Sequence, residues 1–408
     1  MPSQPNGPKS QELGDVEGWD INCGTTLRVE NHDAERRATL RAMDMMHMFR
    51  NYVRDLTQAI CSNWNRFWFT PADPATIGLL RILAGGMILY THAVWTLDLN
   101  AFFGPQAWLN REVVSLAQRD GFQWSHLWLC ESPAVLWTVH GLALGVCLLF
   151  MLGLWSRVTS ILTCLITLSY AQRAPEAMFG LDQINGFLAI YLALAPSGDA
   201  YSLDRWLLAR RRRSRETADA LGPRGLKSHD FGYGPLPPAL PSISANIATR
   251  LIQIQMCMLY LFAGLSKLQG EAWWNGTALW GAVANLEYQS LDMLWLVHQP
   301  WLVNLLTHVT IIWEISYSAL IWNRLTRPLV LAVAVPIHLG IGFCLGMITF
   351  GSVMLIANLA FVSPALVRSL FDRRTTTPQS GHAALQGPNW LVANKHRALR
   401  ASSTRSID

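Results

Sequence analysis

The sequence is poor in charge and lacks the cysteine patterns of disulfide-rich or zinc-binding domains. Only 14% of its 408 residues are Asp, Glu, Lys or Arg, while 51% are hydrophobic. Its seven cysteines form no C-x-x-C pair and no zinc-ligand spacing, so we expect no disulfide framework and no metal site. The low charge and the long apolar runs exclude a set of soluble domains and predict a membrane protein.

Apolar segments long enough to cross a membrane recur along the chain. We predict an all-α fold, a polytopic membrane helix bundle with about eight spans. The spans are expected at about residues 76–97, 134–154, 158–170, 183–196, 251–268, 301–322, 328–346 and 348–366. Alternating spans place Arg157, Arg324 and the basic segments on one side of the bilayer. Because Lys and Arg gather on the cytoplasmic side, we expect both termini to be cytoplasmic and the membrane to be the plasma (inner) membrane.

Polar segments divide the chain into parts. Residues 1–39 are expected to be a disordered tail without a cleavable signal, 40–69 an amphipathic helix on the membrane surface, and 70–370 the transmembrane domain. Within that domain, residues 205–245 form an arginine-rich linker, expected on the cytoplasmic side against anionic lipid. A polar, basic tail at 371–408 closes the chain. The basic runs lack the features of a nucleic-acid site, so the lipid bilayer is the expected partner.

The segment Leu251–Leu268 is an apolar helix with a lysine at its end. Lys267, Tyr260 and Gly264 share one face of it, because they are spaced by three, four and seven residues. An ionisable group in a membrane span is by default a functional hypothesis, here on the extracytoplasmic side. The alternative is that the Lys267 ammonium reaches the lipid head groups. The same explanation serves for Arg81, which lies near the start of the first span.

Other polar residues lie inside predicted spans. Glu314 and His338 could meet across a helix pair, either as a structural pair or as a polar layer beneath Lys267. Counted along the helices, Lys267 is too shallow to bond directly to Glu314 unless its span is displaced inward. We expect Lys267→Met to leave the stability nearly unchanged, because the substitution removes a charge and keeps the volume. The fourth span is short and begins with Asp182 and Asn185, which we expect to line a cavity rather than to face lipid.

Several stretches resemble a known family. FTPADPATIGLLRILAGGMILY begins the similarity and GLDQINGFLAIYLALAPSGDAYSLDRW continues it. The most specific are YLFAGLSKLQGEAWWNGTAL, which contains Lys267, and PIHLGIGFCLGMITFGSVMLIANLAF, which contains His338. Over roughly Phe67–Pro364 the chain resembles the core of vitamin K-dependent γ-glutamyl carboxylase and the wider group of HTTM (horizontally transferred transmembrane) domain proteins.

That resemblance implies a chemistry. Lys267 occupies the position of the family lysine that deprotonates a quinol, His338 matches a family histidine, and Ser266 replaces a basic residue. The implied cofactor is reduced vitamin K or menaquinol, without a metal. An amine accepts the quinol proton only when it is uncharged, which burial in an apolar pocket favours. Reaction of the deprotonated quinol with oxygen would give an epoxide and a strong base.

The residues expected around the quinol are Tyr260, Gly264, Trp273, Trp274, Asp182 and Asn185, with Glu314 and Ser266 behind them. Family carboxylases continue into a large extracytoplasmic domain that binds the protein substrate, whereas this chain stops after its last span. A separate protein substrate or acceptor-binding partner is therefore left open. Three functions remain: a quinol-dependent epoxidase that also carboxylates or does not, a non-catalytic scaffold or quinone and lipid binder, and a small-solute transporter.

Overall fold

The computed structural model describes residues 22–117, 124–220 and 239–371, and these residues are helical apart from turns and one isolated β-bridge between Ala72 and Ser242. The all-α prediction is confirmed for this part of the chain. Most of the predicted tail at 371–408 and part of the linker lie outside the described residues.

The α-helices are α1 (Asn22–Phe69), α2 (Ala75–Trp95), α3 (Leu99–Phe103), α4 (Arg111–Ala117), α5 (Pro133–Leu152), α6 (Ser156–Arg173), α7 (Gly180–Leu194), α8 (Leu203–Ala220), α9 (Ile243–Lys267), α10 (Glu271–Trp274), α11 (Ala278–Val283), α12 (Pro300–Leu320), α13 (Arg327–Cys344), α14 (Ile348–Asn358) and α15 (Pro364–Phe371). Short 3₁₀ helices are η1 (Thr96–Asp98), η2 (His126–Leu129), η3 (Pro175–Ala177), η4 (Leu294–His298) and η5 (Leu359–Phe361).

Residues Met1–Phe67 form one unit, whose described part belongs to the long helix α1. Residues 40–69, predicted to form an amphipathic helix, are helical. The helix begins earlier than expected, at Asn22. Its apolar side chains, such as Met46 at 67% and Phe49 at 69% exposure, are uncovered in this unit. Contact of this face with a lipid surface stays a prediction.

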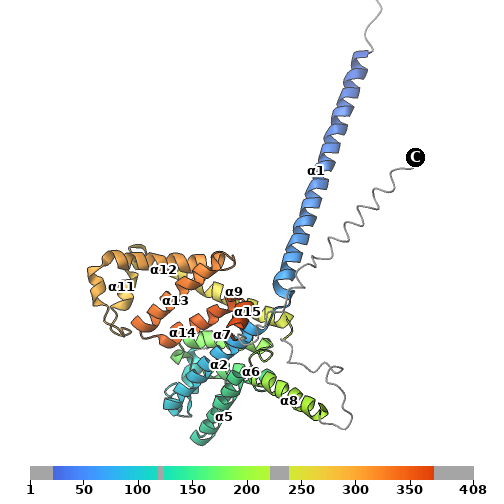
Figure 1. The fold of residues 1–408 in the computed structure, drawn as a ribbon. Coiled ribbons are helices and arrows are strands. Elements are labelled where there is room, and N and C mark those ends of the chain that lie inside the picture. Colours follow the sequence, from blue (N-terminus) through green and yellow to red (C-terminus); the bar gives the residue numbers. More distant parts are fainter. Residues whose placement is uncertain (1–21, 118–123, 221–238, 372–408) are drawn as a thin grey trace, which may run out of the picture. The chain divides into compact units, whose positions relative to one another are not determined.

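The second unit, Trp68–Asp408, is a helical bundle (Figure 1). Helices α2, α5, α6, α7, α9, α12, α13 and α14 follow the order of the eight predicted spans. Within the described residues, four helical segments are long and apolar enough to cross a membrane: Ala75–Phe103, α5, α9 and α13. Helices α14 and α15, bent by 110°, make a fifth if they form one span. A membrane protein with four or five candidate spans is thus supported, and eight crossings stay a prediction.

The core lies where α2 meets α5, α7 and α14, with α9 beside them (Figure 1). Its side chains are apolar and almost fully buried. They include Ile77, Leu80, Ile88, Phe150, Leu188, Leu192, Ile252, Met256, Val353 and Ala357. Lipid tails are as apolar as these side chains, so helices in a membrane associate by close packing and by polar contacts between them. The polar contacts therefore show how the bundle is fixed.

Arg81, on α2, ties the bundle together at one end. Its Nη1 donates to the Ser197 carbonyl at 2.8 Å and its Nη2 to the Tyr201 carbonyl at 2.7 Å. The residue is 0% exposed. The expectation that Arg81 reaches the lipid head groups is wrong, because the turn between α7 and α8 folds over the guanidinium and supplies its acceptors.

Asp204, in the first turn of α8, holds the neighbouring turn between α5 and α6. Its carboxylate accepts hydrogen bonds from the backbone N–H groups of Trp155 and Ser156, both at 2.9 Å, and from the Ser156 hydroxyl at 2.6 Å. Burial alone would raise the pKa of Asp204, but these hydrogen bonds and the charge of Arg81 outweigh it and hold the pKa below its usual value. Helix α2 and two turns of the chain are therefore joined through the opposite charges of Arg81 and Asp204.

An ion pair closes the bundle near the start of α2. Arg368 on α15 donates from Nε and Nη2 to the two carboxylate oxygens of Asp73, at 2.6 and 2.8 Å. Asp73 also accepts from the N–H of Ala75, the first residue of α2, at 2.9 Å. Burial alone would raise the pKa of Asp73, but the bonds from Arg368 and Ala75 lower it overall.

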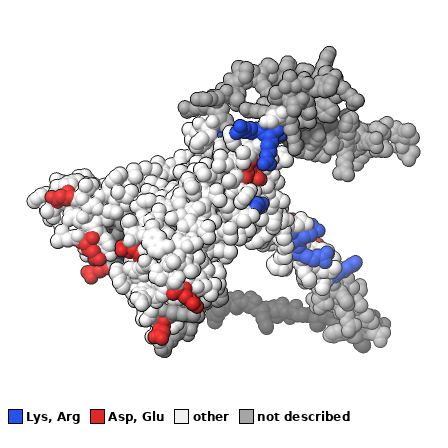
Figure 2. Space-filling model, turned by 90° about the horizontal axis from the view of Figure 1, so that it is seen from below, with Lys and Arg blue, Asp and Glu red and all other residues white. Residues whose placement is uncertain are grey.

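In Figure 2 most of the Asp and Glu side chains visible on this face lie towards one side, and most of the Lys and Arg side chains lie towards the other. We call the end with the α5–α6, α7–α8 and α12–α13 turns the basic end. Its arginines include Arg157, Arg205, Arg210, Arg211, Arg212, Arg324, Arg327 and Arg368. The opposite, acidic end carries Asp98, Glu112, Glu131, Glu176, Glu271, Glu287 and Asp292. Such asymmetry is typical of membrane proteins whose basic end is cytoplasmic, an orientation that stays a prediction here.

We expect Arg81→Met to lower the free energy of unfolding by about 3 kcal/mol, because two buried carbonyls lose their donor and Asp204 loses a neighbouring charge. Arg157→Met is the matched control, since Arg157 makes only a 3.3 Å bond to the Ala195 carbonyl. It should cost less than about 1 kcal/mol. Unfolding in one detergent, followed by tryptophan fluorescence, measures both variants. Equal losses would contradict the role assigned to Arg81.

The Asp73–Arg368 pair predicts a pH dependence. Since the folded-state pKa of Asp73 lies below its unfolded value, the pair contributes stability above about pH 4 and loses it as the pH falls through the folded-state pKa. At neutral pH, Asp73→Asn should cost about 1 kcal/mol, because the pair is partly exposed. The difference in melting temperature between wild type and Asp73→Asn should therefore shrink between about pH 5 and pH 3. A constant difference over this range would show that the charge of Asp73 is not what matters.

Candidate functional site

The last residue of α9 forms an ion pair with the middle of α12. The Lys267 Nζ lies 2.9 Å from Oε1 and 2.7 Å from Oε2 of Glu314. The Glu314 side chain is 10% exposed and that of Lys267 is 24% exposed, so the carboxylate is buried and the amine is only partly covered. The expectation that Lys267 is too shallow to reach Glu314 is wrong.

The packing of the outer half of α12 explains why the depth of Glu314 relative to Lys267 was predicted wrongly. Asn304 donates to the Asn275 carbonyl at 3.2 Å, and the Thr307 hydroxyl accepts from the Leu279 N–H at 3.2 Å. These contacts show that the first turns of α12 pack against α10 and α11, which follow the end of α9. Helix α12 therefore begins beyond the end of α9, and the two helices do not share an outer boundary.

Gly264 lets the two helices approach each other at the ion pair. A Cβ atom at Gly264 would lie 2.7 Å from Cγ1 of Ile315 and 3.2 Å from Cβ of Glu314, closer than side chains tolerate. The position is one turn before Lys267, so the absence of a side chain brings the amine within reach of the carboxylate. Gly264 was expected beside a quinol, but its buried face packs on α12.

A second polar group lies one level deeper on the same face of α9. Tyr260 is seven residues before Lys267, about 10 Å along the helix. Its hydroxyl is 2.6 Å from Nε2 of His338 and accepts from Nδ2 of Asn358 at 2.8 Å. Asn358 accepts in turn from the Tyr317 hydroxyl at 2.7 Å. The four side chains form a buried network that joins α9, α12, α13 and α14.

The directions of these hydrogen bonds indicate which atoms of Tyr260 and His338 carry hydrogen. Since Tyr260 accepts from Asn358, its own proton goes to Nε2 of His338, and a neutral His338 then carries its hydrogen on Nδ1. Among the described residues, this Nδ1 has no hydrogen-bond partner. The predicted pairing of Glu314 with His338 is wrong, because Glu314 binds Lys267 and His338 binds Tyr260. No hydrogen bond links the pair to the network within the described part of the chain.

The aromatic and small residues predicted near the amine differ in their placement. Trp273 lies beside it, with its ring centre 5.4 Å from the Lys267 Nζ. Trp274 is 65% exposed and donates to the Leu268 carbonyl at 2.7 Å. Ser266 is exposed, and its hydroxyl donates to the Ala263 carbonyl of its own helix at 2.9 Å. Of these three, only Trp273 is in contact with the amine.

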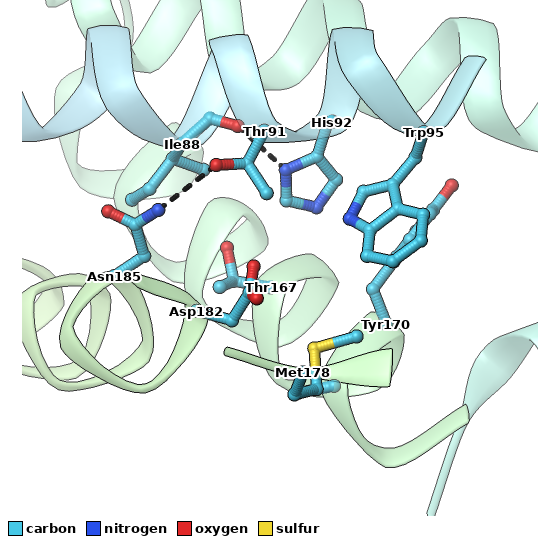
Figure 3. Close-up of a pocket in the computed structure, with 10 residues that line it drawn as sticks. Ile88, Thr91, His92, Trp95, Thr167, Tyr170, Met178, Asp182 and Asn185 are labelled. Atoms are coloured by element: carbon cyan, nitrogen blue, oxygen red, sulfur yellow. Dashed lines mark hydrogen bonds between the residues drawn. The ribbon is translucent and has the colours of Figure 1, made fainter. Parts of the chain in front are cut away.

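Asp182 and Asn185 line a cavity, as predicted, but in a different part of the bundle from the lysine (Figure 3). The cavity lies between α2, α6 and α7 and has room for about one water molecule. Asp182 is in the first turn of α7, where its carboxylate accepts the Phe179 N–H at 2.9 Å. Their role at a quinol stays a prediction; in this conformation the space does not admit a quinone ring.

The cavity is bordered by buried polar atoms without a partner among the described residues: His92 Nε2, Thr167 Oγ1 and Asn185 Oδ1. His92 Nδ1 lies 2.8 Å from the Ile88 carbonyl and must carry the hydrogen, which leaves a lone pair on Nε2. Asn185 Nδ2 donates to Thr91. Such unsatisfied groups are typical of sites filled by water.

The histidines near this cavity were not predicted as functional residues from the sequence. His92 on α2 and His140 on α5 flank Tyr170 on α6, and the His140 Nδ1 lies 2.7 Å from the Tyr170 hydroxyl. The signal was available, because both histidines lie inside predicted spans, where ionisable side chains are rare and usually functional. It was overlooked because neither histidine lies in a stretch that carried the family resemblance.

The HTTM domain model matches residues 243–365, from the first residue of α9 to the second residue of α15. The matched segment, which is less than half of the chain, contains Lys267, Glu314 and His338. The match is consistent with the vitamin K-dependent carboxylase-like family. Comparison with curated proteins and with solved structures gave no match. The helices before α9 lie outside the matched segment, so their part in the predicted domain at 70–370 stays a prediction.

The Lys267–Glu314 pair places an amine and a carboxylate 2.7–2.9 Å apart, close enough for a direct hydrogen bond. Because two charges removed from water carry a large desolvation cost, each group depends on the other inside the bundle. No group of three or more potential metal ligands of the His, Cys, Asp or Glu kind occurs among the described residues.

The pair changes the expected effect of removing the lysine. Lys267→Met leaves Glu314 buried without a counter-charge, and we expect it to lower the free energy of unfolding by about 3 kcal/mol. Adding Glu314→Gln should recover at least about 1 kcal/mol of this loss, because the buried charge is gone. Ser266→Ala is the control and should change little. Unfolding of the single and double variants in detergent measures the coupling, and additive losses would argue against the ion pair.

Proposed function

We propose that the HTTM domain binds a reduced quinol of the vitamin K or menaquinone type beside Lys267 and promotes its oxygen-dependent epoxidation. The observation that carries the proposal is the ion pair of Lys267 with the buried Glu314, at 2.7 Å. In the proposed mechanism the Glu314 carboxylate is the acceptor to which the lysine proton would pass, so that the neutral amine can act as a general base. The family resemblance supports the quinol as the proton donor.

In the proposed complex the quinol ring would lie beside Trp273 and Lys267. Trp273 lies 5.4 Å from the amine and offers a face for stacking, and the Lys267 side chain is open enough, at 24% exposure, to be reached from the acidic end. In this proposal Glu314 takes the lysine proton, and the free amine takes the proton of the hydroxyl group. The bound quinol, with oxygen, supplies the epoxide and a strong base.

The proposal includes the setting of the domain. Eight crossings with the basic end in the cytoplasm would put Lys267 on the extracytoplasmic side of a plasma membrane. A protein substrate for carboxylation would then be a separate chain on that side. Tyr260 and His338 would support the site from beneath, since their network joins α9 to α13 and α14.

A quinone binder without catalysis is the second candidate. It is favoured by the same ion pair, because Lys267 and Glu314 join α9 to α12 at the close contact of Gly264 whether or not a proton moves. In that case the pair is structural, and the quinone would bind against Trp273 without reacting.

Purified protein in nanodiscs, given vitamin K hydroquinone or menaquinol and air, tests the proposal. We expect epoxide, detected by mass spectrometry, and a loss of at least about 100-fold in its rate for Lys267→Ala, since a general base contributes about that much. Arg324→Ala, an exposed residue at the other end, is the control. Quenching of tryptophan fluorescence by the quinol without epoxide would favour the binder. No epoxide and no quenching with either quinol would reject both candidates.

A further inference from the structure

An apolar groove lies at the basic end, away from Lys267. It is formed by Ile82 on α2, Met151 and Leu152 at the end of α5, and Leu203 and Trp206 at the start of α8. Its volume is about 380 Å³, within the range of small-molecule sites. The lining is mostly apolar, so the groove suits a hydrocarbon chain better than a polar metabolite.

The groove has firm walls. Arg81, next to Ile82, binds the carbonyl of Tyr201, and Asp204, next to Leu203, caps the turn that follows α5. These polar contacts hold the first turn of α8 against α2 and the end of α5. The groove is therefore part of the packed bundle and does not depend on the position of the rest of α8.

One face of α8 leads from the groove to positive charge. Leu203, Trp206 and Arg210 are spaced by three and four residues, so they follow one another along the same face. The Arg210 guanidinium lies over the Trp206 ring, 5.5 Å from its centre. Helix α8 extends away from the bundle beyond this point (Figure 1). A molecule with its apolar part in the groove would meet a guanidinium about one helical turn farther on.

The first part of α8 is strongly basic. Residues 203–215 contain six arginines and one acidic residue, Asp204. That carboxylate is already occupied by backbone N–H groups and by Ser156. Arg210 and Arg211 are exposed. Arginine binds phosphate oxygens in a bidentate manner, so a phosphate group is the complement that this face lacks.

We propose that the groove and the adjoining arginines of α8 form a binding site for one anionic glycerophospholipid. An acyl chain would fill the groove, and the phosphate would lie at Arg210 and Arg211. A zwitterionic lipid carries an ammonium group that the arginines repel, and a soluble phosphate would leave the apolar groove unused. This site is independent of the quinol chemistry, because it lies at the other end of the bundle.

Native mass spectrometry of the full chain, released from nanodiscs with equal amounts of phosphatidylglycerol and phosphatidylcholine, tests the site. We expect one phosphatidylglycerol to be retained in preference. Arg210→Gln with Arg211→Gln should reduce that preference about fivefold per arginine, which is the effect of about 1 kcal/mol for each charge near a lipid surface. Ile82→Trp, which fills the groove, should abolish retention while the melting temperature stays close to that of the wild type.

Arg324→Gln is the matched control, because Arg324 is an exposed arginine of the basic end outside the groove. If it reduced the preference as much as a change at Arg210, the effect would be general charge and the site would be rejected. Equal retention of both lipids by the wild type would also overturn the proposal. Should Ile82→Trp fail to fold, Trp206→Ala gives the same reading by removing the wall between groove and arginine.

Discussion

The buried charges of Arg81 and Glu314 have hydrogen-bond partners on other segments, and these contacts help to decide where the helices meet. An ionised group in an apolar interior is stable only when its partners are in place. Arg81 therefore fixes the turn between α7 and α8 through two carbonyls, and Glu314 fixes the end of α9 through Lys267. Since the apolar faces of the helices pack as well against lipid as against one another, these few contacts select the arrangement.

The two ends of the bundle use their polar groups differently. At the basic end, Arg81 and Asp204 bind backbone atoms and Asp73 binds Arg368, which suits a structural role. Towards the acidic end, the amine of Lys267 is partly exposed, and the cavity beside His92 is bordered by polar atoms without a partner among the described residues. Unsatisfied polar groups and reachable charges are costly in a structure, so these positions are the candidates for ligand binding.

Sequence patterns located the helices well and the contacts poorly. Hydropathy predicted α2, α5, α9 and α13 within a few residues, except that α9 begins eight residues before the expected span. The pairing of Glu314 could not be predicted, because counting 1.5 Å per residue assumes that neighbouring helices start at the same depth. The segments α10 and α11 break that assumption by extending the layer in which α12 begins. Arg81 was misjudged for a similar reason: nothing in its own helix shows that a distant turn folds over it.

The close contact at Gly264 links the fold to the proposed chemistry. It sets the distance between α9 and α12, and so it brings the Lys267 amine within reach of the Glu314 carboxylate. In the proposed mechanism the proton would move within this pair, across 2.7 Å, so that no net charge would be added to the membrane. The property that makes Lys267 a candidate base therefore belongs to the helix pair, not to the lysine alone.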